Sequence, residues 1–532
     1  MAGQSTKAER VIIVGAGMGG LAAAVVLAAA GRDVLVLEKN AGPGGKMRHV
    51  AVPGGVVDAG PTVFTMRWVF DRLSEAAGRD LTDYVGLKRA GVLARHAWPG
   101  GGRLDLYADP EASADAIGNF AGPKEAEGYR RFVRDSARVF AALKETYIAA
   151  DRPSPIGLGR RIGAHRIATL GALKPFSTLW SALGGYFNDP RLRQLFGRYA
   201  TYCGSSPFEA PATLMLVAHV EQDGVWLVDG GMHALATGLA AMARDLGASV
   251  RFDTAVDEIA LDGGQVAGVR THNGFEPARQ VVFNGDVSAL GAGLLASLPR
   301  SLAPVAERHR SLSAITFAMR GAPEGLDLAR HTVCFSDDYA AEFNALGRGR
   351  QVPGRPTVYL CAQDRSDEGA IEPHASFDAG AGGDGQAGRN AQGERLFGLV
   401  NAPAIGDRHT FTEEEQNACL ASLHHSLGLC GLKLDLAAPP AITTPTDFNA
   451  LFPGSGGALY GRASHGWMAA FQRPGARTPI PGLFLAGGSV HPGPGVPMAA
   501  LSGMIAGKAL LSTRLSMPRS SRVATAGGIS TA

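Results

Sequence analysis

The first three apolar stretches of the chain have the lengths of a strand, a helix and a second strand, in that order. Val11–Val14 predicts a short buried strand, residues 21–30 an Ala- and Leu-rich helix that Gly31 ends, and Val34–Leu37 a second strand. A strand, a helix and a strand in this order predict the start of an α/β domain.

Later apolar stretches predict further strands and helices. Residues 366–395 hold no apolar cluster and predict a flexible surface loop, and residues 516–532 predict a disordered tail. The sequence Asp262-Gly263-Gly264 predicts a hairpin turn. The further predicted strands lie at residues 56–58, 226–228, 249–252, 256–261, 266–271, 281–283 and within 481–488, and the predicted helical segments at residues 124–150, 191–220, 232–246 and 499–511.

The turn between the first strand and the first helix carries a glycine motif. Gly15 makes the turn, Gly17 lets the backbone approach a pyrophosphate, and Gly20 lets the helix pack closely on the strand. Glu38 ends the second strand 38 − 15 = 23 positions after Gly15, near the ~20 expected for an acid that binds a ribose hydroxyl. The combination predicts a dinucleotide site but leaves the nucleotide open.

Two further glycine turns bear on that choice. Gly44-Gly45-Lys46 follows Glu38 and is typical of FAD-binding flavoproteins, in which a cation offsets pyrophosphate charge. The alternative for Lys46 and Arg48 is a solvated surface pair. Near the other end of the chain, Leu485-Ala486-Gly487-Gly488 leads into Val496-Pro497-Met498, whose N–H groups at a helix start could face a flavin ring.

Bulk composition excludes several classes of protein. The 532 residues include 51 basic and 48 acidic side chains, a net charge of +3, and so lack the basic excess of a nucleic-acid-binding protein. The five scattered cysteines form no C-x-x-C pair, so neither a disulfide framework nor a metal site is expected. The polar N-terminus has no apolar signal core, and no apolar run reaches the ~20 residues of a membrane span. A reducing cytoplasm fits these features.

With its motifs in place, the chain resembles the phytoene desaturase family of FAD-dependent carotenoid desaturases. A second group of segments is similar to bacterial 1-hydroxycarotenoid 3,4-desaturases, also called methoxyneurosporene dehydrogenases. Met498-Ala499 stands where phytoene desaturases typically have Gly-Val, which argues against phytoene as the substrate. The motifs of the wider family are Gly15 to Gly20, Glu38, Gly44 to Lys46, Asp58 to Thr62, Gly230 to Met232 and residues 485–497; those of the narrower group are residues 331–339, 356–365, 457–467 and 495–503.

The resemblance implies an α/β fold in which a Rossmann-type FAD-binding domain is interleaved with a mixed α+β substrate domain, as in amine oxidases and phytoene desaturases. The discontinuous FAD-binding domain would comprise residues 1–90, 222–300 and 465–515. The substrate and membrane-association domain would comprise residues 91–221 and 301–464.

Cofactor roles follow from the same resemblance, residue by residue. Glu38 would bind the adenosine ribose, and Lys46, beside Gly45, would lie near the pyrophosphate. Val256 would contact the adenine side, or would simply belong to the core. The residues expected to line the flavin are Gly60, Pro61, Thr62, Gly488, Val496, Pro497 and Met498.

The implied activity is C-3,4 desaturation of an acyclic 1-hydroxycarotenoid, with hydride transfer to FAD. Since the polyene stabilises the cation left behind, a weak base suffices, and no catalytic residue is assigned. His233, His465 and His491 are candidate proton acceptors or structural histidines. Alternatives are a phytoene or neurosporene desaturase, an isomerase, or a flavin amine oxidase. Cys430 lies too far from the last motif to suggest covalent flavin, and complete glycine motifs argue against a non-catalytic prenyl-binding escort.

The segment between Asp151 and Asp189 contains no acidic residue. Its arginines, including Arg160 and Arg161, alternate with apolar and aromatic side chains, a composition typical of a segment that lies on anionic lipid. We therefore expect a cytoplasmic enzyme that is peripherally associated with the inner membrane. The alternative is a cationic lid packed on its own core. The electron acceptor stays open.

Overall fold

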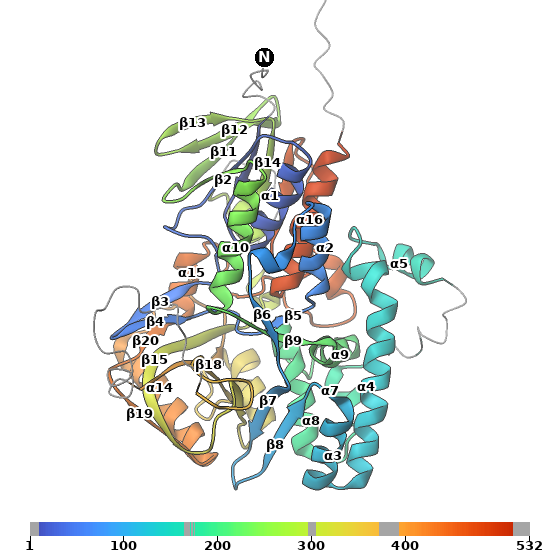
Figure 1. Ribbon diagram of the computed structural model, residues 1–532, viewed down its shortest axis with the longest axis vertical. Coiled ribbons are helices and arrows are strands. Elements are labelled where there is room, and N and C mark those ends of the chain that lie inside the picture. Colours follow the sequence, from blue (N-terminus) through green and yellow to red (C-terminus); the bar gives the residue numbers. More distant parts are fainter. Residues whose placement is uncertain are drawn as a thin grey trace, which may run out of the picture.

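A computed structural model describes residues 10–163, 171, 174, 176–295, 305–371 and 393–513. Five of the described strands form a parallel sheet in the order β10-β2-β1-β14-β21. Its strands come from three distant parts of the chain, so the two ends of the sequence meet in one sheet (Figure 1). The bounds are β1 (Val11–Val14), β2 (Val34–Leu37), β10 (Ser249–Arg251), β14 (Gln280–Phe283) and β21 (Leu483–Leu485).

Helices α1 (Met18–Ala29) and α16 (Val496–Leu511) lie side by side against this sheet (Figure 1). Both are buried on most sides because they are built from Ala, Gly, Val, Leu and other apolar residues. A β-carbon added to Gly503 would lie 2.0 Å from the carbonyl oxygen of Gly19, so only glycine permits this approach. α2 (Trp68–Ala76) and α10 (Met232–Asp245) also contact α1.

A second, larger sheet lies below the first in Figure 1. Its strand order is β19-β15-β18-β17-β16-β7-β8, and β20 also pairs with β15. Phe317, Leu360 and Val400 are fully buried between this sheet and α14 (Glu413–Leu429). The strand bounds are β7 (Val92–Ala97), β8 (Arg103–Tyr107), β15 (Ser313–Gly325), β16 (His331–Cys334), β17 (Val358–Ala362), β18 (Glu394–Ala402), β19 (Leu432–Leu436) and β20 (Ala441–Thr443).

A group of helices packs at the lower right of Figure 1. Phe132, Phe187 and Phe196 pack against one another in its interior, with ring centroids 4.8–5.6 Å apart. The helix bounds are α3 (Pro110–Ala121), α4 (Pro123–Leu143), α5 (Pro155–Ile162), α7 (Leu179–Leu183), α8 (Pro190–Gly197) and α9 (Leu216–Asp223), with a π-helical turn at Lys144–Ile148 and 3₁₀ turns at Arg198–Cys203 and Ala212–Met215.

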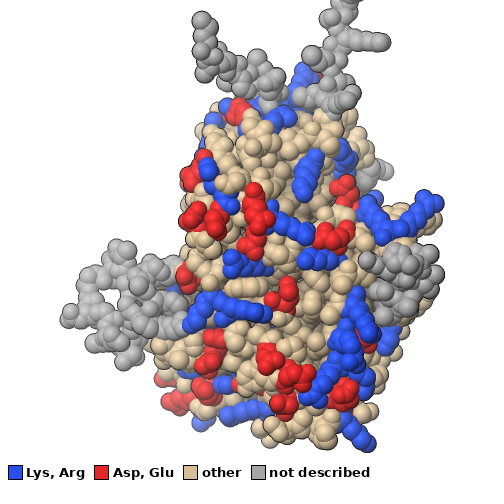
Figure 2. All heavy atoms as spheres, turned by 45° about the vertical axis from the view of Figure 1, so that its right-hand side comes forward, with Lys and Arg blue, Asp and Glu red and all other residues tan. Residues whose placement is uncertain are grey.

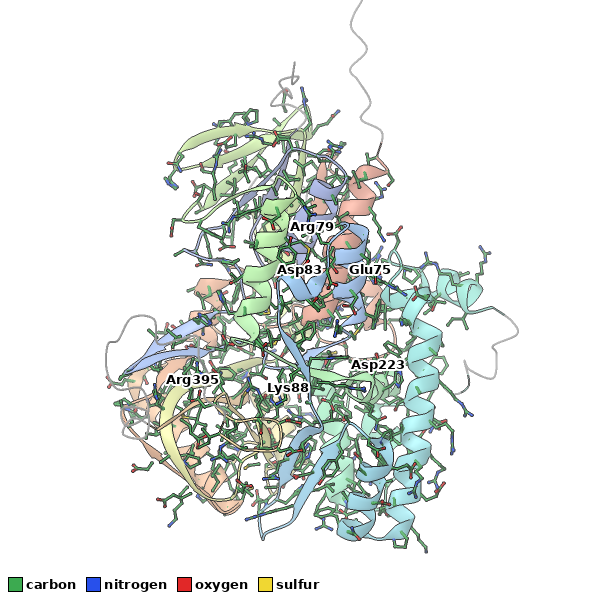
Figure 3. The ribbon with its side chains drawn as sticks, in the orientation of Figure 1. Glu75, Arg79, Asp83, Lys88, Asp223 and Arg395 are labelled. Carbon is green, nitrogen blue, oxygen red and sulfur yellow. The ribbon has the colours of Figure 1, made fainter. Side chains whose placement is uncertain are left out.

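Smaller elements connect these parts. In Figure 3, Lys88 and Asp223 lie near the middle of the molecule, where β6 and α9 meet, and Arg89 Nη2 donates to the Asp223 carbonyl over 3.3 Å. The remaining strands are β3 (His49–Val52), β4 (Gly55–Asp58), β5 (Phe64–Thr65), β6 (Leu87–Arg89), β9 (Val225–Val228), β11 (Val256–Asp262), β12 (Gln265–Thr271) and β13 (Gly274–Pro277). The remaining α-helices are α11 (Val287–Gly291), α12 (Tyr339–Asn344) and α15 (Pro445–Leu451).

The structure confirms the α/β fold and the predicted elements, with shifted ends. The helix predicted over 124–150 is α4, which ends at Leu143 and passes into the π-helical turn. The last helix starts at Val496 rather than at residue 499. The hydrophobic pattern does not predict most strands of the second sheet, in which β16 pairs with β7, more than 200 residues away in the sequence. The domain boundaries stay a prediction.

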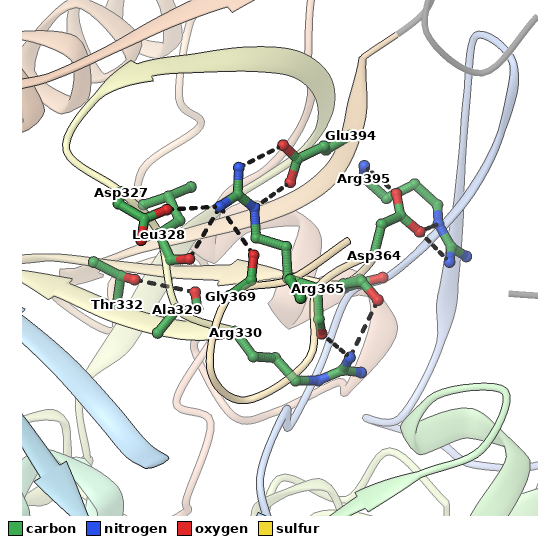
Figure 4. Close-up of polar contacts among 12 residues, drawn as sticks. Asp327, Leu328, Ala329, Arg330, Thr332, Asp364, Arg365, Gly369, Glu394 and Arg395 are labelled. Carbon is green, nitrogen blue, oxygen red and sulfur yellow. Dashed lines mark hydrogen bonds and ion pairs between the residues drawn. The ribbon is translucent and has the colours of Figure 1, made fainter. Parts of the chain in front are cut away.

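The predicted loop 366–395 was too long at its C-terminal end, because β18 begins at Glu394. Charged residues near both ends form ion pairs that fix the chain there (Figure 4): Arg365 Nε binds Glu394 over 2.7 Å, and Arg395 Nη2 binds Asp364 over 2.6 Å. Asp367 accepts hydrogen bonds from the N–H groups that begin β7. The middle of the loop, residues 372–392, and the tail predicted over residues 516–532 lie outside the described residues.

Candidate functional site

A cavity of about 1070 Å³ lies at the carboxyl ends of the parallel strands and extends to the second sheet and the helices. Gly20 stands behind its wall, where a β-carbon would lie 2.1 Å from the Gly15 carbonyl oxygen, so it serves the packing of α1 on β1. The other predicted cofactor residues all line this one cavity: Gly15, Gly17, Glu38, Gly45, Lys46, Gly60, Pro61, Thr62, Val256, Gly488, Val496, Pro497 and Met498.

Glu38 lies at the end of β2 with its side chain buried. Its Oε2 accepts the Ala16 N–H over 2.7 Å, and its Oε1 accepts the backbone and side-chain N–H groups of Asn40 over 3.0 and 2.7 Å. These bonds hold the carboxylate at the mouth of the glycine turn, where an acid that binds a ribose is expected.

The N-terminus of α1 opens onto the cavity. Gly17 precedes the helix, no side chain caps it, and no acidic residue lies in the first turn. Its free N–H groups and positive dipole end therefore suit a phosphate. Asn284, which follows β14, also lines the cavity; its Nδ2 donates to the Gly15 carbonyl over 3.1 Å and would lie 2.9 Å from a β-carbon on Gly17. This residue was missed, although its place after a strand of the sheet was a usable signal.

Lys46 is half-buried and lines the cavity, which argues against the solvated surface pair that its sequence left open. Its Nζ donates to the Leu459 carbonyl and lies 5.1 Å from the centre of the Phe452 ring. Burial lowers the pKa of this ammonium group, and the nearby carboxylate of Asp286 opposes that shift. The side chain thus supplies positive charge at the wall of the cavity, although its contact with a pyrophosphate stays a prediction.

A second helix N-terminus meets the first in this cavity. α16 starts at Val496 after Gly495, again without a side-chain cap or an acid in its first turn. On another part of the cavity wall, Thr62 Oγ1 lies 2.5 Å from Tyr359 Oη, which also lies 2.7 Å from His331 Nδ1. Two uncapped helix starts and a glycine cradle fit a dinucleotide that carries a flavin.

None of the three candidate histidines lines the cavity. His233 Nε2 lies 3.0 Å from the Pro43 carbonyl oxygen. His465 Nε2 accepts the Ser206 N–H over 3.1 Å. His491 Nε2 lies 2.9 Å from the Ala150 carbonyl oxygen, and burial lowers the pKa of this ring to about 4. These contacts favour a structural role for each histidine over proton transfer.

Beyond the cofactor residues the cavity becomes apolar. Its mouth is marked by Trp467, which lines it while remaining 47% exposed, and by Phe176, whose ring centre lies 5.8 Å from that of Trp467. The apolar lining includes Leu143, Ile148, Leu158, Ile162, Leu214, Val217, Val220, Phe397, Leu399 and Phe471. Such a channel suits a long hydrocarbon.

The charged side chains on the face shown in Figure 2 are of both signs and interspersed. Among the described residues, no helix is both long and apolar enough to cross a membrane. The same residues contain no group of three or more His, Cys, Asp or Glu side chains that could hold a metal ion.

Comparison with known proteins gives consistent results. The family model described as flavin containing amine oxidoreductase matches residues 18–511. A hydroxyneurosporene desaturase of Rubrivivax gelatinosus is 49% identical over 99% of this chain and 97% of its own length. One from Cereibacter sphaeroides is 42% identical over 96% of this chain and 99% of its own length.

Solved structures share the fold at low sequence identity. A putrescine oxidase covers 95% of this chain and 99% of its own, with a TM-score of 0.55 and 15% identity. An oxidoreductase from Methanosarcina mazei covers 93% of this chain and 99% of its own, with a TM-score of 0.57. The chain therefore belongs to the flavin-containing amine oxidoreductases and, within them, to the FAD-dependent carotenoid desaturases of the phytoene desaturase family.

Proposed function

We propose that this enzyme removes the hydrogens at C-3 and C-4 of an acyclic 1-hydroxycarotenoid. The observation that carries the proposal is the continuity of one cavity, which leads from the predicted flavin-lining residues into an apolar channel. Hydroxyneurosporene desaturases that are 41–49% identical over nearly their whole length support the choice of substrate.

In this proposal bound FAD would supply the acceptor for a hydride from an allylic carbon. The chain contributes binding, orientation and exclusion of water. Gly15, Gly17 and the start of α1 would hold the diphosphate, Glu38 the ribose, and Val256 the adenine side. Gly60 to Thr62 and the start of α16 would hold the flavin. Since the polyene stabilises the cation that hydride removal leaves behind, a weak acceptor would suffice for the proton.

The membrane proposal rests on the mouth of the channel. Ile156 on α5 is 71% exposed, Phe176 is 83% exposed, and the neighbouring Leu158 and Trp467 line the cavity. Exposed apolar side chains at the opening of a hydrocarbon channel suit entry from lipid. Arg161 Nη1 donates to the carbonyls of Thr146 and Asp151, so it fixes α5 to the π-helical turn. This leaves the exposed Arg160 as the described arginine of α5 that would contact anionic headgroups.

Product analysis tests the reaction. The purified enzyme with FAD would be given 1-hydroxyneurosporene, neurosporene and phytoene separately in liposomes, and the position of each new double bond would be determined by mass spectrometry and NMR. We expect a new C-3,4 double bond in the hydroxylated carotenoid and slow turnover of the others. Preferential consumption of phytoene, or oxidation of amines instead, would refute the proposal.

A further inference from the structure

A group of buried and half-buried polar side chains interrupts the apolar lining of the cavity. Tyr339 and Glu342 stand one turn apart on α12 and therefore share a face of that helix. Thr357, just before β17, and Arg198 and Tyr202, in the 3₁₀ turn after α8, line the same cavity. The cofactor roles described above use none of these five residues.

Two atoms of this group have no hydrogen-bond partner although they are buried. Glu342 Oε2 accepts hydrogen bonds from Ser336 Oγ over 2.8 Å and from Thr357 Oγ1 over 2.7 Å, but Glu342 Oε1 has none. Tyr339 Oη also has none. The two residues are only 2% and 7% exposed. Since buried polar atoms are nearly always paired, an unpaired donor and an unpaired acceptor on a cavity wall indicate a ligand group.

The charges around Tyr339 and Glu342 limit which kind of ligand group can bind there. The half-buried Arg198 guanidinium lies 5.4 and 5.6 Å from the ring centres of Tyr202 and Tyr359. The carboxylate of Glu221, which accepts hydrogen bonds from Tyr202 and, over 2.7 Å, from Tyr199, offsets its charge. Burial raises the pKa of Glu342 to about 7.

The Arg198 cation disfavours an ammonium group here, and the Glu342 carboxyl disfavours a second carboxylate. A neutral hydroxyl, which both donates and accepts, fits both unpaired atoms.

We propose that Tyr339 and Glu342 bind the 1-hydroxyl group of the carotenoid, an inference that rests on the function proposed above. Tyr339 Oη donates a hydrogen bond to the hydroxyl oxygen, and the hydroxyl in turn donates one to Glu342 Oε1. The polar group adjoins the predicted flavin wall, because Arg198 lies over Tyr359 and Tyr359 Oη contacts Thr62. The hydroxyl is on C-1, only two carbons from C-3. A binding site for the hydroxyl close to the flavin would therefore determine which carbons face the flavin.

The test compares substrates with and without the hydroxyl. We would measure kcat/KM for 1-hydroxyneurosporene and for neurosporene in the FAD-loaded wild type, Tyr339→Phe, Glu342→Leu and the isosteric Glu342→Gln. The matched control is Tyr186→Phe, a buried tyrosine whose hydroxyl donates to Asp135 over 2.8 Å and which does not line the cavity. The FAD content and circular dichroism of each variant establish that it is folded.

We expect Tyr339→Phe and Glu342→Leu to reduce the preference for the hydroxylated substrate by about 10- to 100-fold, mainly by slowing that substrate. Glu342→Gln should keep most of the preference because an amide still pairs with a hydroxyl, and Tyr186→Phe should keep all of it. Equal losses on both substrates would assign Glu342 to proton transfer instead and overturn the inference.

An unchanged preference in both Tyr339→Phe and Glu342→Leu would also overturn it, and if Glu342→Leu failed to fold, Tyr339→Phe would decide alone. The proposed function fails separately, if the wild type itself shows no preference for the hydroxylated carotenoid.

Discussion

The contact between α1 and α16 allows a sharp test of how the cofactor site is built. A β-carbon on Gly503 would lie 2.0 Å from the Gly19 carbonyl oxygen, about 1 Å closer than real contacts allow, and that oxygen belongs to a helix and cannot rotate away. Gly503→Ala should therefore push α16 from α1. Because the helix starts at Gly17 and Gly495 both face the cavity, moving α16 should also change the distance between these two helix starts.

Overpacking of this kind costs about 1–3 kcal/mol. If displacement of the helix start accounts for most of this free-energy cost, the dissociation constant for FAD should rise by roughly 5- to 150-fold. Titration of the apoprotein by quenching of flavin fluorescence, beside urea unfolding, measures both effects. Gly428→Ala is the matched control, since Gly428 lies in α14 with nothing within 4 Å of an added β-carbon. Wild-type FAD affinity and stability in Gly503→Ala, or an equal loss in Gly428→Ala, would refute the reasoning.

Three further predictions concern single charges. Glu38→Gln should weaken FAD binding about tenfold in the same titration by disturbing the bond to Ala16, whereas the exposed Glu75→Gln (Figure 3) should not. Since the folded protein raises the pKa of Glu342 from 4.5 to about 7, its contribution to stability should fall by about 2–3 kcal/mol between about pH 5 and about pH 8. Urea unfolding of wild type and Glu342→Gln would measure this difference, and a rise would contradict it. Arg160→Glu should reduce flotation with anionic liposomes while Lys433→Glu on β19 does not; equal flotation of both would remove an electrostatic role for α5.

The cofactor end of the cavity was predictable because its signals are local. Gly15, Gly17 and Glu38 fall within one strand–helix–strand unit, whose spacing alone determines where they meet. Asn284 could have been found by the same logic, since β14 is parallel to β1 and Asn284 follows its carboxyl end. Val256 lines the cavity, which fits the contact expected for it without establishing an adenine there.

The polar group around Glu342 could not be predicted from the sequence. Arg198, Tyr339, Glu342 and Thr357 come from three separate segments, and no periodic pattern relates them. Their proximity depends on how the helical region packs against β16 and β17. Tyr339 and Glu342 fall inside or beside the segment 331–339 that the resemblance singled out, yet that resemblance assigned no chemistry to either residue.

The cofactor region of the cavity is formed mainly by backbone groups and the polar region by side chains, and this difference affects how substrate specificity is determined. The cofactor end consists of glycines, helix starts and backbone N–H groups, so a substitution there changes the backbone itself, as the 2.0 Å and 2.1 Å approaches at Gly503 and Gly20 illustrate. The polar end consists of side chains on α12, β17 and the turn after α8, where Phe for Tyr or Leu for Glu alters chemistry without moving a helix. We therefore expect substitutions at Tyr339 and Glu342 to change substrate preference while FAD binding stays intact, and substitutions at the glycine cradle to reduce activity toward every carotenoid alike.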